Sequence, residues 1–358
     1  MKEKKELGEI GRREERREER REGRVKGRIV MVMMVVMVMG CNSGGVKDTE
    51  KVFLSEMVNL GKGFLDVFVS FGDMITGTLG IKADTKKSDI GKYFSDIEKT
   101  MNSVKEKLQE EVSKNGQYEK VRKVVEEFIN GIVDKIAAGA KEAALGASGS
   151  EVIGNAVKNE DAKPAEAASV NALVKGIKEI VGVVLKDNEG NAGATKTGDT
   201  EKKSVGKLLG GQDKGEEAIA AAASATIGAV SGADILKAIS VSGETSVEPT
   251  IQAAKNAAEI AAAKKEDDKE FEIESAKKDA VIAGGIALRG MAKGGKFAAK
   301  TNEEKSANAV NGAVASAVNK VLSTLVIAIR NTVDEGLKGI NKVLGEIKQG
   351  EGSEVKSN

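Results

Sequence analysis

The strongest constraint on the fold is a run of apolar residues near the C-terminal end of the 358-residue chain, in which neighbouring members lie three or four positions apart. This spacing places all of them on one face of an α-helix, whereas a strand alternates its faces with every residue. At about 1.5 Å per residue the helix would be about 57 Å long, and it would bury its apolar face within the chain or against a second copy. The run comprises Val310, Val314, Ala317, Val321, Leu325, Ile329, Val333, Leu337, Ile340, Leu344 and Ile347.

Three segments in the N-terminal half repeat the helical spacing of apolar residues, over 53–75, 88–108 and 121–136. Six of the eight phenylalanines lie in this part of the chain, so we expect the thickest part of the core there. The apolar faces of 53–75 and of the C-terminal run are the strongest in the chain. We therefore expect these two helices to pack on each other.

The middle of the chain has a different composition, rich in Ala, Gly, Ser and Asp from about residue 138. Few prolines and many Ala, Lys and Glu favour helices over sheets. The sequence predicts an all-α protein, an elongated helical bundle with long N- and C-terminal helices and a region of short helices and loops between them. The pieces expected in that region are helices over 170–185, 214–239, 249–265 and 280–289, a polar loop over 187–204, and a solvated helix face over the acidic residues of 266–274.

The composition also excludes most catalytic chemistry. The chain has no His and one Cys, so it has no imidazole for a metal site or a catalytic triad, and neither an intramolecular disulfide nor a Cys-cluster metal site can form. The formal net charge is +1, but residues 1–28 hold 12 basic and 8 acidic residues, and the remaining chain is mildly acidic. It lacks the basic face with interleaved aromatics that is typical of nucleic-acid binding. We expect no enzyme activity, no cofactor, no metal and no nucleic-acid partner.

One segment imitates a phosphate-binding loop. Residues 290–297 match the first seven positions of G-x-x-x-x-G-K-[ST], but the eighth, which must supply a hydroxyl for magnesium, is Phe297. A strand should precede such a loop, whereas 280–289 has a helical pattern. The acidic residues of 266–274 lack the spacing of a calcium loop. Neither segment is therefore expected to be a binding site.

The N-terminal residues have the pattern of a targeting signal. The 11 consecutive apolar residues at 29–39 are too few to span a bilayer, which needs about 20, but they fit the apolar region of a signal peptide. Residues 38–41 resemble a bacterial lipobox, so Cys41 is the expected lipidation site; the alternative is a buried strand with a free thiol.

The expected domain organisation begins with a lipoprotein signal peptide over 1–40 and a lipidated tether over 41–50. One helical ectodomain follows over 51–348, and a disordered tail follows it over 349–358. Within the ectodomain, 51–137 and 303–348 are expected to form the core, and 138–302 an outward region.

The chain resembles a known family along almost its whole length after Cys41. The stretches that carry the resemblance are 41–45, 60–68, 80–101, 170–186, 286–299 and 318–333. Through them the chain is similar to the variable large proteins, a branch of the variable major proteins of relapsing-fever Borrelia, and to the related variable surface lipoprotein of Lyme-disease spirochaetes. The Arg/Glu-rich residues 12–22 depart from the compact basic leader expected of the family.

The resemblance implies a helical protein that is anchored through a lipid on Cys41 to the cell outer membrane and faces the extracellular side. It implies a membrane-proximal core of N- and C-terminal helices, variable loops away from the membrane, and antigenic variation that evades host antibodies. The alternative function is a host-binding adhesin, whose distal lysines would meet a glycosaminoglycan or a plasma protein; the oligomeric state stays open. The segments in which we expect variable epitopes are 138–169, 187–216, 240–250 and 262–280.

Overall fold

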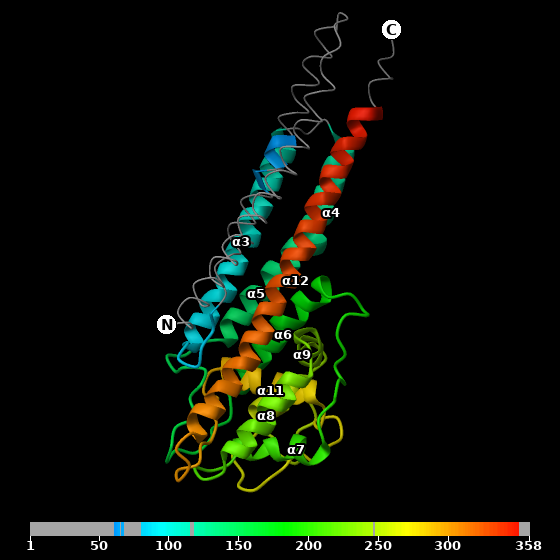
Figure 1. The fold of residues 1–358 in the computed structure, drawn as a ribbon. Coiled ribbons are helices and arrows are strands. Elements are labelled where there is room, and N and C mark those ends of the chain that lie inside the picture. The colour runs from blue at the N-terminus through cyan, green and yellow to red at the C-terminus, as the bar shows by residue number, and fades with distance from the viewer. Residues whose placement is uncertain (1–60, 65, 68–79, 115–117, 246–247, 351–358) are drawn as a thin grey trace, which may run out of the picture. The chain divides into compact units, whose positions relative to one another are not determined.

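The structure is a computed structural model that describes residues 61–64, 66–67, 80–114, 118–245 and 248–346, together with the backbone of 347–350 (Figure 1). The chain divides into two compact units, Met1–Glu56 and Met57–Asn358, and all the described residues belong to the second. The predicted signal peptide, the tether with Cys41, most of the predicted helix over 53–75 and residues 351–358 lie outside the described residues.

The described part of the chain is built from α-helices, with one short π-helix and one short 3-10 helix. Its β-type pairing consists of three isolated bridges. The predicted all-α class is confirmed. In chain order the elements are α3 (Lys87–Lys114), α4 (Glu119–Phe128), the π-helix η1 (Ile129–Val133), α5 (Asp134–Gly146), α6 (Ala167–Val184), α7 (Asp199–Ser204), the 3-10 helix η2 (Val205–Leu209), α8 (Glu217–Ala229), α9 (Gly232–Ser240), α10 (Ala257–Ala262), α11 (Asp279–Met291) and α12 (Ser306–Gly350).

The long C-terminal helix that the sequence predicts is α12. Its 45 residues span about 68 Å at about 1.5 Å per residue. The members of the predicted apolar face from Val310 to Leu344 are all at most 5 % exposed. They are covered from within the chain, because α12 contacts α4, α6, α8, α9 and α11.

By length and composition, α12 could also cross a membrane, since an 18-residue window within Ser306–Glu346 has a mean hydropathy of 1.7. The pair α8 and α9 would pass the same test together, although a bend of 96° separates them. Half of the α12 window is buried inside the protein. This burial is what a core helix with an apolar face packed on other helices shows.

The long helices α3 and α12 run along the length of the unit, and their C-terminal parts extend with α4 beyond the short helices (Figure 1). The helix predicted over 88–108 is confirmed by α3, which buries one face that includes Ile90, Phe94 and Leu108. Where α4 meets α12, the ring of Phe128 occupies the space beside Gly336. A Cβ atom on Gly336 would overlap that ring, so the close approach of the two helices requires glycine there.

The helix predicted over 121–136 continues further than expected. It passes through η1 into α5 and ends at Gly146. Its last turns pack on α6 through small residues, with no room for a side chain at Gly176. A Cβ atom added there would lie only 2.3 Å from the carbonyl oxygen of Gly139 and 2.7 Å from the Cβ atom of Ala143. The change to Ala and Gly near residue 138 therefore marks a tight contact between two helices and not the start of a loop.

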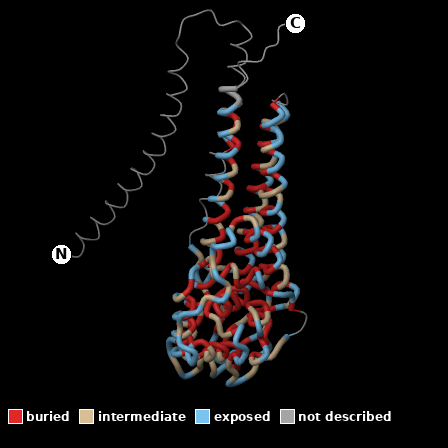
Figure 2. The backbone as a smooth tube through the Cα atoms, turned by 90° about the vertical axis from the view of Figure 1, so that its right-hand side faces the viewer, coloured by how far each residue is buried: buried red, intermediate tan, exposed pale blue. Residues whose placement is uncertain are grey.

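The short helices gather at the other end of the unit, around the N-terminal part of α12, and buried residues are most concentrated there (Figures 1 and 2). All 13 residues of α11 are buried, whereas α3 buries one face. Among the described elements, the most complete burial therefore surrounds α11 and not the Phe-rich N-terminal part. Small residues permit this complete burial of α11, because they allow α10 to approach closely: Gly284 and Gly285 of α11 lie against Ala257 and Ile260 of α10.

The predictions for the middle of the chain were partly right. The helices over 170–185 and 280–289 are confirmed by α6 and α11, and 214–239 is helical as α8 and α9. The helix predicted over 249–265 contracts to the six residues of α10, and the acidic residues of 266–274 lie in a loop and not on a helix. Side chains there bond to other backbones, as when Glu266 accepts from the amide of Ile251 at 2.9 Å. The last six residues of the predicted polar loop form α7.

The contact between α4 and α12 gives a test with a matched control. Gly336→Ala should lower the free energy of unfolding by about 1–3 kcal/mol, because the added methyl group overlaps the buried ring of Phe128. Gly339→Ala lies one turn further along α12, with no atom within 4 Å of its Cβ position, and should leave stability unchanged or raise it by up to about 1 kcal/mol. Denaturant unfolding followed by circular dichroism measures both, and equal effects would contradict the packing.

Candidate functional site

The sequence-predicted site residue, Cys41, lies outside the described residues, so its lipidation stays a prediction. The segment that imitates a phosphate-binding loop is described, and it forms the end of α11 and the chain that follows. We call residues 292–298 the strap. Two buried cations, Lys87 and Arg289, are bonded to it, and neither was singled out by sequence reasoning.

Lys87 is the first residue of α3, and its side chain has no exposed surface. Its Nζ donates to the carbonyl oxygens of Ala292 at 2.6 Å, Gly295 at 2.7 Å and Arg289 at 3.3 Å. An ammonium group has three protons, so these three acceptors account for all of them. The acceptors lie at and just beyond the C-terminal end of α11, where carbonyls lack partners within the helix and the helix dipole attracts a cation.

Arg289 makes the same kind of contact with a second helix end. Its Nη1 donates to the carbonyl oxygens of Ala261 at 3.0 Å and Ala263 at 2.9 Å at the end of α10, and its Nε donates to Lys296 in the strap at 2.9 Å. The carbon of the guanidinium lies 5.8 Å from the ring centroid of Phe297, a distance at which a cation is attracted to a ring face.

Burial sets the electrostatics of both groups. Loss of water lowers the pKa of Lys87 to about 7; Glu151 acts against this shift, and the charge of Arg289 adds to it. Burial also lowers the pKa of the Arg289 guanidinium to about 9, opposed by Glu248. The site therefore holds two neighbouring cations that donate to backbone carbonyls, and among the described residues the buried Nη2 of Arg289 has no hydrogen-bond partner.

This arrangement has the opposite polarity to a phosphate-binding loop. Such a loop turns its N–H groups inward on an anion, whereas Arg289 and the strap present carbonyl oxygens to cations. Phe297, at the position where the motif needs Ser or Thr, has no exposed surface. The two strap lysines point to carboxylates, Lys293 to Glu166 and Lys296 to Glu160. The geometry agrees with the sequence argument against a nucleotide site.

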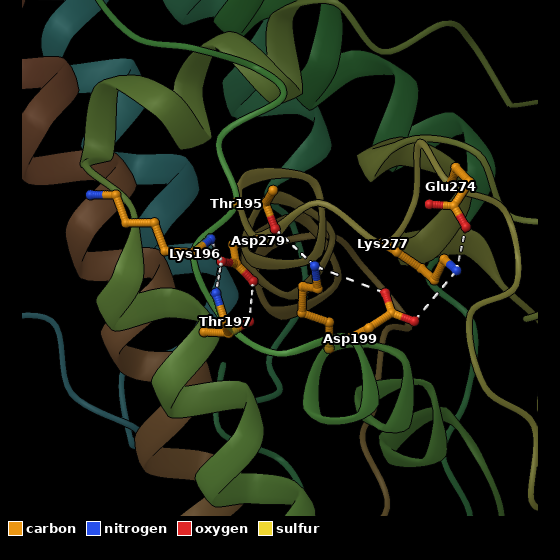
Figure 3. Close-up of polar contacts among 8 residues, drawn as sticks. Thr195, Lys196, Thr197, Asp199, Glu274, Lys277 and Asp279 are labelled. Atoms are coloured by element: carbon orange, nitrogen blue, oxygen red, sulfur yellow. Dashed lines mark hydrogen bonds and ion pairs between the residues drawn. The ribbon is translucent and has the colours of Figure 1, made fainter.

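A second polar cluster fixes the exposed loop between α6 and α7 (Figure 3). Asp279, in the first turn of α11, has no exposed surface and accepts from the backbone N–H of Lys196 at 2.5 Å, the backbone N–H of Thr197 at 2.9 Å and the hydroxyl of Thr197 at 2.6 Å. Nearby, Lys202 donates to the hydroxyl of Thr195 at 3.0 Å. The polar loop predicted here is thus held against α11 by a buried carboxylate.

Two of the acidic residues of 266–274 form ion pairs with lysines from other segments. Asp268 pairs with Lys214 at 2.7 Å, and Glu270 pairs with Lys207 at 3.3 Å and Lys203 at 3.6 Å. In the part of the chain that the structure describes, no group of three or more Cys, Asp or Glu side chains is placed to hold a metal ion. These carboxylates bind the loop to η2 and to the segment before α8.

A pocket of about 390 Å³ lies beside the strap. Its lining carries both kinds of charge, from Lys163 and Lys296 and from Glu151 and Glu160. Lys296 and Glu160 already pair with each other across it. The lining therefore has no net preference for an anion or a cation.

The role of Asp279 can be tested through the loop that it holds. Asp279→Asn should lower the free energy of unfolding by about 1–3 kcal/mol, because a neutral amide replaces a buried charged acceptor of three hydrogen bonds. It should also speed tryptic cleavage after Lys196, which mass spectrometry can follow. The control is Asp199→Asn, whose side chain is 60 % exposed and pairs only at 3.7 Å and 4.0 Å with lysines. Equal cleavage in both variants would contradict the assignment.

Comparison with known proteins identifies the family. A sequence profile described as Borrelia lipoprotein matches residues 64–344. Variable large protein 4 and variable large protein 17 of Borrelia hermsii are each 58 % identical, over 328 and 327 residues, covering 89 % of this chain and 93 % and 92 % of those proteins. The crystal structure of the Lyme disease variable surface antigen VlsE of Borrelia burgdorferi superposes with a TM-score of 0.73 at 36 % identity, covering 84 % of this chain and all of that one. The chain therefore belongs to the variable large protein family of Borrelia lipoproteins.

Proposed function

We propose that this protein is a lipid-anchored antigen on the outer surface of the cell, which presents changeable loops to host antibodies on a constant helical core. The names of its relatives, variable large proteins and a variable surface antigen, support this proposal. The fold is shared with VlsE although most aligned residues differ between the two chains. A fold that persists through so many substitutions suits a protein whose surface is replaced.

The observation that carries the proposal is the separation of exposed loops from the buried core. The loops over 186–198 and 264–275 are polar and mostly exposed, whereas the apolar faces of α11 and α12 are covered. Substitutions on exposed loop side chains usually change stability by less than about 0.5 kcal/mol. Antibody-binding residues can therefore change there with little effect on the fold.

The burial pattern also narrows the surface proposed to vary. Of the four segments expected to carry epitopes, 187–216 and 262–280 overlap the two exposed loops. The first part of 138–169 belongs to α5, where Ala140 and Ala143 have no exposed surface. We infer that variation concentrates in the exposed loops and spares that part of α5.

The anchor is proposed to be Cys41. A basic segment, an apolar run of signal-peptide length and a lipobox-like sequence precede it. Two or three acyl chains on one cysteine give stable anchoring, since each buried methylene contributes about 0.8 kcal/mol. The long helices would then stand nearer the membrane than the loops do.

The alternative function, an adhesin for glycosaminoglycans or plasma proteins, needs a surface of lysines free to meet an anionic partner. At the short-helix end, lysines such as Lys214, Lys265 and Lys300 are paired with carboxylates. No observation on the described residues favours this function over display to antibodies.

Anchoring and exposure can be tested in Borrelia cells that express the protein. Cys41→Ala should abolish incorporation of radioactive palmitate and release the protein from the membrane fraction, because the lipid has no other attachment point. Ser43→Ala is the control and should keep both. Protease added to intact cells should remove the unaltered protein; its survival on intact cells, with loss after lysis, would contradict the outer-surface location.

Antigenic display can be tested by exchanging loops. Antiserum raised against this protein should bind cells that display it more strongly than cells that display a relative about 58 % identical. Transfer of 186–198 and 264–275 into that relative should transfer binding, which flow cytometry measures. Equal binding to both parents, or no transfer by the loops, would contradict the proposal. Gene sequences from successive isolates of one infection would map the varying positions directly.

A further inference from the structure

Two segments that are far apart in sequence run side by side among the short helices. Residues 194–212 pass from the loop after α6 through α7 and η2, and residues 267–280 run past them in the opposite direction into α11. We call the exposed side chains of these two segments the paired surface. The contacts that join the segments follow in antiparallel order: Ala194 with Ala280, Asp199 with Lys277, Lys203 with Phe271, Lys207 with Glu270 and Gly211 with Asp267.

Backbone atoms and a buried carboxylate fix the two segments to each other. The amide of Ala280 donates to the carbonyl of Ala194, and the amide of Phe271 donates to the carbonyl of Lys203, each at 3.1 Å. Close to the first of these bonds, the buried carboxylate of Asp279 accepts from the backbone N–H groups of residues 196 and 197 (Figure 3). A shift of either segment would break these bonds, so the paired surface is a rigid target that a partner can bind with little ordering cost.

The paired surface carries charges of both signs beside an exposed apolar side chain. Ile273 is 37 % exposed, and its carbonyl accepts from the amide of Lys277 at 3.1 Å. The ammonium group of Lys277 lies between two carboxylates, that of Asp199 at 3.7 Å and that of Glu274 at 2.5 Å (Figure 3). An apolar contact with a polar rim is the usual composition of a surface that binds another protein.

The chemistry of this surface fits the combining site of an antibody. Antibody loops rich in Tyr, Ser and Asn supply apolar contact together with adaptable hydrogen bonds. A polyanion needs a field of one sign, whereas Lys203 and Lys207 are both paired with Glu270. A footprint of standard size takes about 800 Å² and about 20–30 residues from the antigen, which is more than the loop over 186–198 or the loop over 264–275 supplies by itself.

We propose that the paired surface is one discontinuous antibody footprint, in which a single antibody contacts 194–212 and 267–280 together. The proposal rests on the display function proposed above, and it adds that the two exposed loops act as one antigenic unit. A substitution in either segment then removes binding of the same antibody, so a change in one loop is enough for escape.

A panel of monoclonal antibody fragments raised against the folded protein tests the paired footprint. Thr200→Arg on α7 and Ile273→Arg each place a large charged side chain on one segment, and neither side chain makes the contacts named above. A fragment whose affinity falls about tenfold or more with one variant should lose a similar factor with the other, as surface plasmon resonance measures. Lys99→Glu is the control, because that side chain is 76 % exposed on α3, and it should leave the affinity of these fragments unchanged.

Hydrogen exchange on the unaltered protein makes the test independent of the variants. When a fragment of this group binds, it should slow amide exchange in 194–204 and in 267–277 together. Protection of one segment alone, or variants that divide the panel into two separate groups, would overturn the paired footprint and leave antibody display intact. If fragments that stain intact cells are indifferent to both variants and protect neither segment, the display function proposed for these loops fails as well.

Discussion

The carbonyl groups at the C-terminal ends of α10 and α11 need hydrogen-bond donors where solvent does not reach, and Lys87 and Arg289 supply them. An unsatisfied buried carbonyl costs about as much as a lost hydrogen bond. A charged donor at a helix C-terminus satisfies several carbonyls at once and is stabilised by the helix dipole. The strap can turn back along α11, and α11 can lie in the centre of the short helices, because these donors are present.

Two kinds of packing divide the structure. The long helices bury stripes of large side chains, as α12 does from Val310 to Leu344. The short helices approach through Ala and Gly, as at Gly285 against Ile260. Small side chains bury little apolar area each, so this end also relies on buried polar ties such as Asp279. These hydrogen bonds involve backbone atoms and few side chains, so the exposed side chains of the loops can be substituted without breaking them.

Periodicity predicted the long elements well. The face of α12 and the helices over 88–108 and 170–185 stand where the spacing places them. Periodicity failed where the apolar side chains are small. The predicted helix ends at 136, where the composition changes to Ala and Gly. In the structure α5 continues to Gly146, because its close backbone contact with α6 stabilises it. Periodicity also failed over 266–274, where carboxylates bond to lysines and amides of other segments and no helix forms.

The sequence by itself determined the helical class, the position of the longest helix, the resemblance to a family and the expected anchor at Cys41, because each depends on residues close together in the chain. Only the tertiary structure decided which of the many charged residues are buried. Lys86 and Lys87 are neighbours of the same type, but one is exposed and the other reaches carbonyls more than 200 positions away. Burial of a charged side chain depends on hydrogen-bond acceptors that the fold brings from distant segments. The local sequence pattern around the residue therefore cannot predict it.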